Sequence, residues 1–235
     1  MIAIFRNLTA AALVLALITA CGGPTVAQQR DRSMRYVSEY PLVSDDGSAV
    51  PNHTVKLPGA IESLPGVVTV GNANGTATLI EFHDLNCPFC RIASVDIDDL
   101  LATDADLKLV LVPYPILGVP SIAAGRVELA VGELGTPQQF YAFQRKIYAL
   151  RGTTDGLRAL TVAHALGFDE RALTALGDSD EITQKMKNLV SLGRSLGLDA
   201  TPSFIVGSVA ILGYPGRQAL TSLVDAAGTC GKVTC

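Results

Sequence analysis

The sequence lacks the motifs by which proteins commonly hold a cofactor or a metal ion. It has no glycine-rich phosphate-binding loop, and its three histidines are not spaced as metal ligands. It also lacks a basic stripe, since 18 lysines and arginines stand against 22 aspartates and glutamates, for a formal net charge of −4. These absences argue against a resident cofactor, a histidine metal site and nucleic acid as a partner.

The N-terminal hydrophobic run is too short to cross a membrane. It extends from Leu8 to Ala20, and it follows Arg6 in a stretch without acidic residues. A membrane-spanning helix needs about 20 apolar residues, whereas a run of this shorter length is typical of the core of a signal peptide. We therefore expect residues 1–20 to be a signal peptide and the rest of the chain to be exported.

Cys21 stands where a lipid could be attached. Ile18-Thr19-Ala20-Cys21 resembles the lipobox of bacterial lipoproteins, which implies cleavage before Cys21 and lipidation of its sulfur. The alternative is cleavage after Ala27, which would release a soluble periplasmic protein. Residues 21–60 have no sustained period and contain several prolines and glycines. We expect them to be a lipid-anchored tether that leads to a domain over residues 61–235.

The five cysteines of the chain suggest an oxidising compartment. Removal or lipidation of Cys21 leaves two pairs, Cys87 with Cys90 and Cys230 with Cys235. The second pair is close enough in sequence to close a small C-terminal loop. We interpret it as a structural disulfide, as is usual in an exported protein. A zinc site that uses all four cysteines is an alternative for these residues.

The stretch from Thr78 to Cys90 carries the strongest chemical signal. It reads as an apolar strand, a short polar turn, and a helix that opens on Cys87-Pro88-Phe89-Cys90. The backbone N–H groups and the positive dipole at a helix start stabilise a thiolate, so we expect Cys87 to be the exposed, reactive sulfur. Pro88 suits the first helical position. Cys90, one turn further, should be more shielded.

Three motifs together resemble the DsbA-like thiol–disulfide oxidoreductases of the thioredoxin superfamily. They are the segment around Cys87-Pro-Phe-Cys90, the stretch 113–118 and the stretch 200–207, and the resemblance covers roughly residues 66–228. It implies an α/β thioredoxin fold with a mixed central sheet. It also implies an all-helical insertion, about residues 119–197, between the third strand and the strand after the cis-proline.

Local patterns predict the same order of elements. The expected strands are 67–70, 76–82, 107–112, 203–206 and 209–212. The expected helices begin at Pro88, Ser121, Thr136, Asp155, Asp169, Asp180 and Gly216. In the helix after Pro88 the spacing predicts that Phe89, Ala93 and Ile97 are buried and that Ser94 faces water.

The resemblance assigns roles around the cysteines. Glu81 matches the buried acid under the second cysteine, where it would carry the proton of Cys90; a solvent-facing edge-strand glutamate is the alternative. Thr201-Pro202 matches the cis-proline loop that pairs with a substrate chain. Phe89 stands where the best-known oxidases of the family carry histidine, which predicts a less oxidising site. His83 and Asp84 flank the turn, and we assign them no role.

The function expected from these features is thiol–disulfide exchange through a reversible Cys87–Cys90 disulfide. The substrates would be exported proteins that contain cysteines, and a membrane partner of unknown identity would restore the redox state. Whether the protein is an oxidase, an isomerase or a reductase stays open. The alternative is a non-catalytic envelope lipoprotein that uses the fold as a binding module.

Overall fold

The computed structural model describes residues 38–235, which contain one mixed sheet and seven α-helices. The expected signal peptide, Cys21 and residues 21–37 of the expected tether lie outside the described residues. The strands are β1 Asn52–Thr54, β2 Val68–Gly71, β3 Ala77–His83, β4 Leu107–Pro113, β5 Ser203–Val206 and β6 Val209–Leu212. The helices are α2 Pro88–Thr103, α3 Val119–Leu134, α4 Pro137–Ala149, α5 Gly156–Ala165, α6 Glu170–Gly177, α7 Asp180–Ser195 and α8 Arg217–Cys230, with a short 3-10 turn, η1, at Ile61–Ser63.

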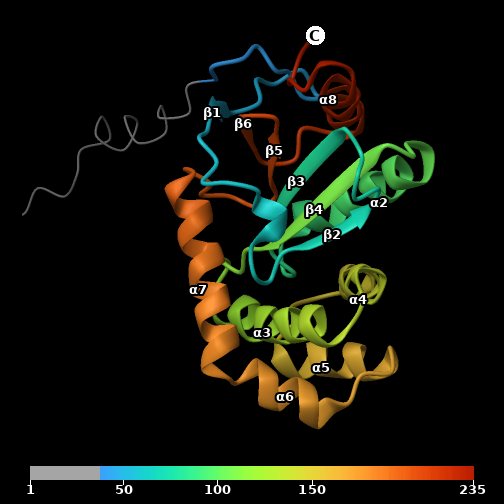
Figure 1. The fold of residues 1–235 in the computed structure, drawn as a ribbon, viewed down its shortest axis with the longest axis vertical. Coiled ribbons are helices and arrows are strands. Elements are labelled where there is room, and N and C mark those ends of the chain that lie inside the picture. The colour runs from blue at the N-terminus through green and yellow to red at the C-terminus, as the bar shows by residue number, and fades with distance from the viewer. Residues whose placement is uncertain (1–37) are drawn as a thin grey trace, which may run out of the picture. The chain divides into compact units, whose positions relative to one another are not determined.

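The sheet has the order β1-β6-β5-β3-β4-β2 (Figure 1). Only β3 and β4 pair in parallel, and every other pair in the sheet is antiparallel. The helices α3–α7 all fall between β4 and β5. The predicted thioredoxin fold with a mixed sheet and a helical insertion is therefore confirmed.

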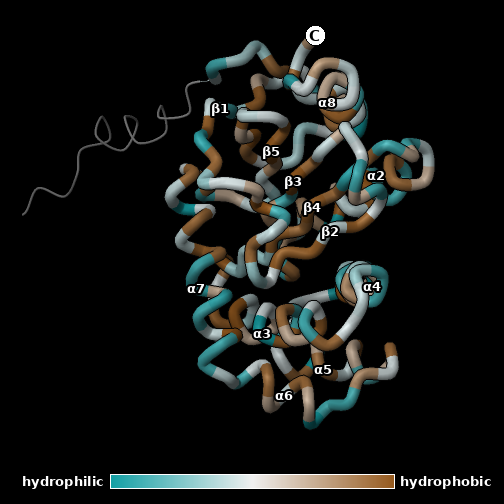
Figure 2. Tube along the Cα trace, viewed as in Figure 1, coloured by the Kyte–Doolittle hydropathy of each residue, from teal (hydrophilic) through white to brown (hydrophobic). Residues whose placement is uncertain are grey.

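The centre of the sheet is apolar on both faces, as Figure 2 shows along β3 and β4. Alternate residues of a strand point to opposite faces. Leu79 accordingly joins one buried cluster, with residues of α2, α4 and α8, whereas Ile80 and Phe82 join a second, with η1 and α7. Glu81 and His83 share the face of Leu79, so two ionisable side chains enter an apolar cluster.

Side-chain caps explain where the helices of the insertion begin. Thr136 forms a capping box with Gln139 at the start of α4, and Asp155, Asp169 and Ser179 cap the next three helices. The predicted cap at Ser121 is wrong. Helix α3 starts two residues earlier, after Gly118, and Ser121 lies buried in its first turn.

Residues 38–60, which we assigned to the tether, pack on the domain in this structure. Strand β1 pairs with β6 at the edge of the sheet, and Val50 and Val55 are buried. The carboxylate of Asp45 accepts hydrogen bonds from the backbone N–H groups of Gln218 and Ala219. This segment therefore closes the open first turn of α8, which lies far away in sequence.

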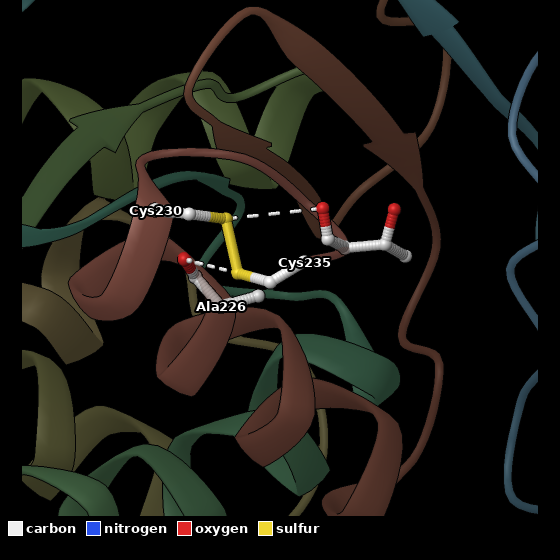
Figure 3. The surroundings of a disulfide bond; sticks show 4 residues. Ala226, Cys230 and Cys235 are labelled. Carbon is white, nitrogen blue, oxygen red and sulfur yellow. Dashed lines mark hydrogen bonds between the residues drawn. A yellow bond between two sulfur atoms is a disulfide. The ribbon is translucent and has the colours of Figure 1, made fainter.

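The C-terminus folds back on the end of α8. Cys230 and Cys235 are joined by a disulfide, and the Cys235 sulfur lies 3.4 Å from the carbonyl oxygen of Ala226 (Figure 3). Val233, inside the loop, is buried against the first apolar cluster. Within residues 38–235 we find no helix that is both long enough and apolar enough to cross a membrane.

Candidate active site

Cys87 occupies the N-cap of α2, immediately before Pro88. Its sulfur accepts a hydrogen bond from the backbone N–H of Cys90 at 3.4 Å, and its thiol donates one to the carbonyl of Thr201 at 3.0 Å. The Cys90 thiol, the Thr201 side chain and the N–H groups of the first turn outweigh burial and lower the pKa of Cys87 to about 6. The site thus favours the thiolate of this cysteine.

Cys87 is nevertheless not the exposed sulfur that the sequence suggested. It is 3% exposed, almost as little as Cys90 at 0%, because the loop at Thr201 covers it. The two cysteines differ in electrostatics rather than in access. Burial raises the pKa of Cys90 well above its ordinary value, and the neighbouring Cys87 and Glu81 raise it further. Both residues are free thiols here, so the disulfide expected between them is not formed in this structure.

Glu81 lies at the bottom of the site, on the same side of the sheet as both cysteines. It is 1% exposed, and burial raises its pKa to about 7, against an opposing effect of His83. β3 is flanked by β5 and β4, so the alternative of a solvent-facing glutamate on an edge strand is wrong. Its Oε1 has no hydrogen-bond partner among the described residues.

The Thr201–Pro202 peptide bond is cis. It places the Thr201 carbonyl against the Cys87 sulfur, and the Pro202 carbonyl accepts a hydrogen bond from Gly213. Thr201 itself is 8% exposed. The structure therefore brings Thr201, Pro202 and Cys87 together, although they are more than 100 positions apart in sequence.

Phe89 lies on the outer side of α2, and the prediction that it is buried is wrong. The buried positions of the helix are Cys90, Ala93, Ser94, Ile97 and Leu100. Phe89 precedes this stripe and is 57% exposed, and Ile92 and Val95 continue an exposed apolar row. Ser94, expected at the surface, is buried and accepts a hydrogen bond from Arg145.

Two residues of the turn before Cys87 hold it to the insertion. The Asp84 carboxylate accepts hydrogen bonds from the backbone of Ile116 and Leu117, at 2.9 and 3.0 Å. The Asn86 side chain donates to the Thr154 carbonyl and accepts from the Thr154 N–H, at 2.8 and 2.7 Å. Sequence reasoning gave neither residue this role, because the partners come from distant parts of the chain.

His83 is fully buried and pairs with Glu128 of α3. Its Nε2 lies 2.7 Å from Oε1 of Glu128, and the exposed fractions of the two residues are 0% and 1%. The sequence analysis left His83 without a role and did not consider Glu128. The spacing of Glu81 and His83 was a usable signal, since residues two apart on a strand share a face.

The comparisons with known proteins agree with this architecture. Residues 63–226 match the family model described as thioredoxin. The chain belongs to the thioredoxin family. A thioredoxin-like oxidoreductase from Silicibacter pomeroyi DSS-3 is 30% identical, with a TM-score of 0.65 over 72% of this chain and 98% of that one.

Two further solved structures share the thioredoxin-like fold. The thiol-disulfide exchange protein alpha-DsbA2 from Wolbachia pipientis is 28% identical, with a TM-score of 0.62 over 67% of this chain and 85% of that one. BdbD from Bacillus subtilis shares the fold, at 20% identity and a TM-score of 0.62 over 74% and 97% of the two chains. No curated protein matches the sequence.

The arrangement of the cysteines in this thioredoxin-family chain bears on the zinc alternative. Cys230 and Cys235 are bonded to each other rather than grouped with Cys87 and Cys90. Among residues 38–235 no group of three or more His, Cys, Asp or Glu side chains is arranged to hold a metal ion. The four cysteines are therefore not arranged as one zinc site in this structure.

Proposed function

We propose that this DsbA-like protein is a thiol–disulfide oxidoreductase that acts through Cys87 and Cys90. The observation that carries the proposal is that the pKa values of two thiols in one helical turn are shifted in opposite directions. The pKa of Cys87 is lowered to about 6, whereas that of Cys90 is raised. A low-pKa sulfur is a good leaving group and is present as the thiolate at neutral pH.

The proposed reaction starts from the Cys87–Cys90 disulfide. A substrate thiolate attacks the Cys87 sulfur, the bond between Cys87 and Cys90 breaks, and the electron pair leaves on Cys90. Glu81 gives its proton to the Cys90 thiolate and becomes a carboxylate. The second substrate thiolate then attacks the substrate sulfur of the mixed disulfide, which releases an oxidised substrate and the Cys87 thiolate.

Thr201 and Pro202 would hold the substrate beside Cys87. The Thr201 carbonyl already lies 3.0 Å from the sulfur, so an extended substrate chain paired with this loop would present its own sulfur at the same place. Phe89 and Pro88 would tune the site, and the exposed ring of Phe89 is available to an apolar substrate side chain. No bound cofactor takes part in the proposed cycle.

The substrates would be exported proteins that contain cysteines, and a membrane protein would reoxidise the dithiol. We propose that the protein works on the periplasmic side of the cell envelope, anchored through lipidated Cys21, with a soluble periplasmic protein as the alternative. Fatty-acid labelling tests the anchor. Label should enter the wild type and be lost in Cys21→Ala.

A non-catalytic binding module remains the second candidate, and the burial of Cys87 at 3% exposure favours it. Exchange assays with a reduced and a scrambled test protein separate the two. The proposed enzyme should oxidise the first or rearrange the second, and Cys90→Ser should trap mixed disulfides through Cys87. Turnover that is equally absent from wild type, Cys87→Ser and Cys90→Ser would instead support the binding module.

A further inference from the structure

Three ionisable side chains meet beneath the two cysteines, shielded from water. Glu81 and His83 lie two residues apart on β3, so their side chains leave the same face of the sheet. Glu128 reaches His83 from α3, with 2.7 Å between Oε1 and Nε2. Each of the three residues is at most 1% exposed.

We propose that His83 and Glu128 are positioning residues that supply a compensating positive charge beside Glu81. This inference rests on the proposed function, in which Glu81 gives its proton to Cys90. The transfer leaves a carboxylate in an apolar cluster, where an isolated negative charge is strongly unfavourable. Protonated His83 offsets that charge, and Glu128 keeps the proton on the imidazole.

The directions of the titrations agree with this assignment. Burial raises the pKa of Glu81 to about 7, and of the two cations that oppose this effect, His83 acts more strongly than Arg145. Burial disfavours the charged form of His83, but the charge and the hydrogen bond of Glu128 outweigh it and raise the pKa of His83. Burial also raises the pKa of Glu128, so both members of the pair hold a proton more tightly than the free side chains do.

Two polar atoms of Glu81 and His83 have no hydrogen-bond partner. His83 Nδ1 and Glu81 Oε1 are both buried without a hydrogen-bond partner among the described residues. Buried polar atoms with no partner are rare in folded proteins. Each of the two side chains therefore keeps one buried polar atom that no hydrogen bond satisfies, which leaves the charge of the other as a source of stabilisation.

The other groups around the pair come from three more places. Asp84 follows β3 and favours the charged imidazole. Cys87 and Cys90 of α2 favour the protonated form of Glu81 when they are thiolates. From α4, Tyr148 stays protonated because burial raises its pKa, and Arg145 is bound to Asp98 at 2.5 Å. His83 thus remains the cation most directly placed to compensate Glu81, whereas the Glu128 carboxylate by itself raises the pKa of Glu81.

The first test reads the charge of His83 in the wild-type protein. The chain has three histidines, so ¹⁵N NMR of the imidazoles can be assigned with His53→Gln and His164→Gln. We expect both nitrogens of His83 to be protonated at pH 7. A neutral His83 ring at pH 7 would overturn the proposal, and this measurement needs no variant at the pair itself.

The second test reads Glu81 by ¹³C NMR of labelled glutamates, with its signal assigned from Glu81→Gln. In His83→Gln the midpoint of Glu81 should rise by about one pH unit or more, because the stronger of its two compensating cations is lost. In Glu128→Gln, which keeps the shape of the side chain, the midpoint should also rise but by less, because the Glu128 carboxylate itself raises the pKa of Glu81. The control is Glu133→Gln, the same change on the surface of α3, where an ion pair with Lys185 is lost. A midpoint that stays near the wild-type value, or falls, would overturn the pair's role.

The third test measures the pH profile of Cys90 attack on a mixed disulfide. The profile should move in Glu128→Gln in the same direction as the Glu81 midpoint, and in a Glu81→Gln background Glu128→Gln should cause no further shift. A wild type that does not exchange disulfides would refute the proposed function, yet the NMR titrations would still report on the pair. Normal exchange with unshifted titrations would overturn the pair alone.

Discussion

At the scale of single residues, the chemistry of the site depends on two cysteines that lie in different surroundings. Cys87 and Cys90 carry the same chemical group and are three positions apart. Cys87 lies at the N-cap of α2, whereas Cys90 is buried in the first turn of that helix. Unsatisfied N–H groups favour an anion at the first position, and an apolar cluster disfavours one at the second. The two surroundings therefore favour the thiolate at Cys87 and the thiol at Cys90.

The Cys87 thiol should ionise with a midpoint of about pH 6. Below that pH the sulfur is a neutral thiol, and above it a thiolate. The ultraviolet absorbance of thiolate in the reduced protein, followed from pH 4 to 9, measures the transition. Cys87→Ser should remove it, whereas a wild-type midpoint near that of free cysteine, about 8.5, would contradict the tuning by the helix start.

Phe89→His should make the Cys87–Cys90 disulfide a stronger oxidant. The exposed position lets an imidazolium approach the Cys87 thiolate without burial, and stabilising the thiolate favours the reduced form. We expect a rise in reduction potential of about 30 mV, a tenfold change in the equilibrium constant. Equilibration against glutathione measures the potential. Phe89→Leu serves as the control, and an equal or lower potential in the histidine variant would contradict the expectation.

Glu81→Gln should stabilise the protein at high pH. The pKa of Glu81 rises from about 4.5 in the unfolded chain to about 7 in the fold, so folding retains a proton between these values. Stability is therefore fully present below about pH 4.5 and falls as pH rises through 7, by about 3 kcal/mol in total. Urea unfolding at pH 5 and pH 8 tests this. Wild type and variant should differ more at pH 8, and a difference that grows towards low pH would show the opposite sign.

At the scale of elements, the start of α8 is completed by a residue from elsewhere in the chain. Helix α2 uses its own Cys87 as N-cap, but α8 begins after Gly216, which has no side chain to offer. Asp45 fills that place from the opposite end of the described chain. The cap also holds the N-terminal segment on the domain, so it connects the start of the folded region to its last helix.

Asp45→Ala should lower the free energy of unfolding by about 1 kcal/mol, the usual cost of losing a helix cap. Two backbone N–H groups of α8, those of Gln218 and Ala219, would lose their acceptor. Urea unfolding of both proteins gives the difference. Asp225→Ala, exposed on the same helix, should change stability little, and an equal loss in the two variants would argue against the cap.

At the scale of the whole molecule, the insertion and the sheet are joined at the turn that precedes Cys87. Asp84 binds the loop after β4, and Asn86 binds the loop before α5. Tyr148 of α4 donates a hydrogen bond to the Asp84 carbonyl at 3.3 Å. The geometry of the cysteines therefore depends on helices that contain neither of them.

Replacement of both Cys230 and Cys235 by alanine should cost about 2 kcal/mol of stability. The disulfide closes a loop with a sequence separation of 5, and short loops restrict the unfolded chain only modestly. Urea unfolding at neutral pH measures the loss, with Thr229→Ala on the same turn of α8 as a control. Exchange by Cys87 should be retained, and loss of exchange with an intact fold would contradict a purely structural role.

The sequence by itself determined the order of strands and helices and the place of Cys87 at a helix start. These depend on local spacing, caps and breakers, which act over a few residues. The edge strand β1 was not predicted, because three residues are too few to show the alternation of apolar and polar side chains that indicates a strand. The predicted helix start at Ser121 was wrong because a residue type that caps helices well can also serve as a buried hydrogen-bond acceptor. Ser121 accepts such a bond from the side chain of Asn86.

Only the tertiary structure decided how far the sulfurs are covered and which groups pair near them, because the resemblance matched Glu81 and Thr201 to the site without giving their burial or contacts. The cover over Cys87 comes from Thr201, and the charge beneath Cys90 from Glu81, His83 and Glu128, on two different elements. Burial and pairing depend on the packing of β3 against α2, α3 and α4, which no local pattern encodes. The position of the thiols could therefore be predicted from the sequence, whereas their ionisation depends on the fold.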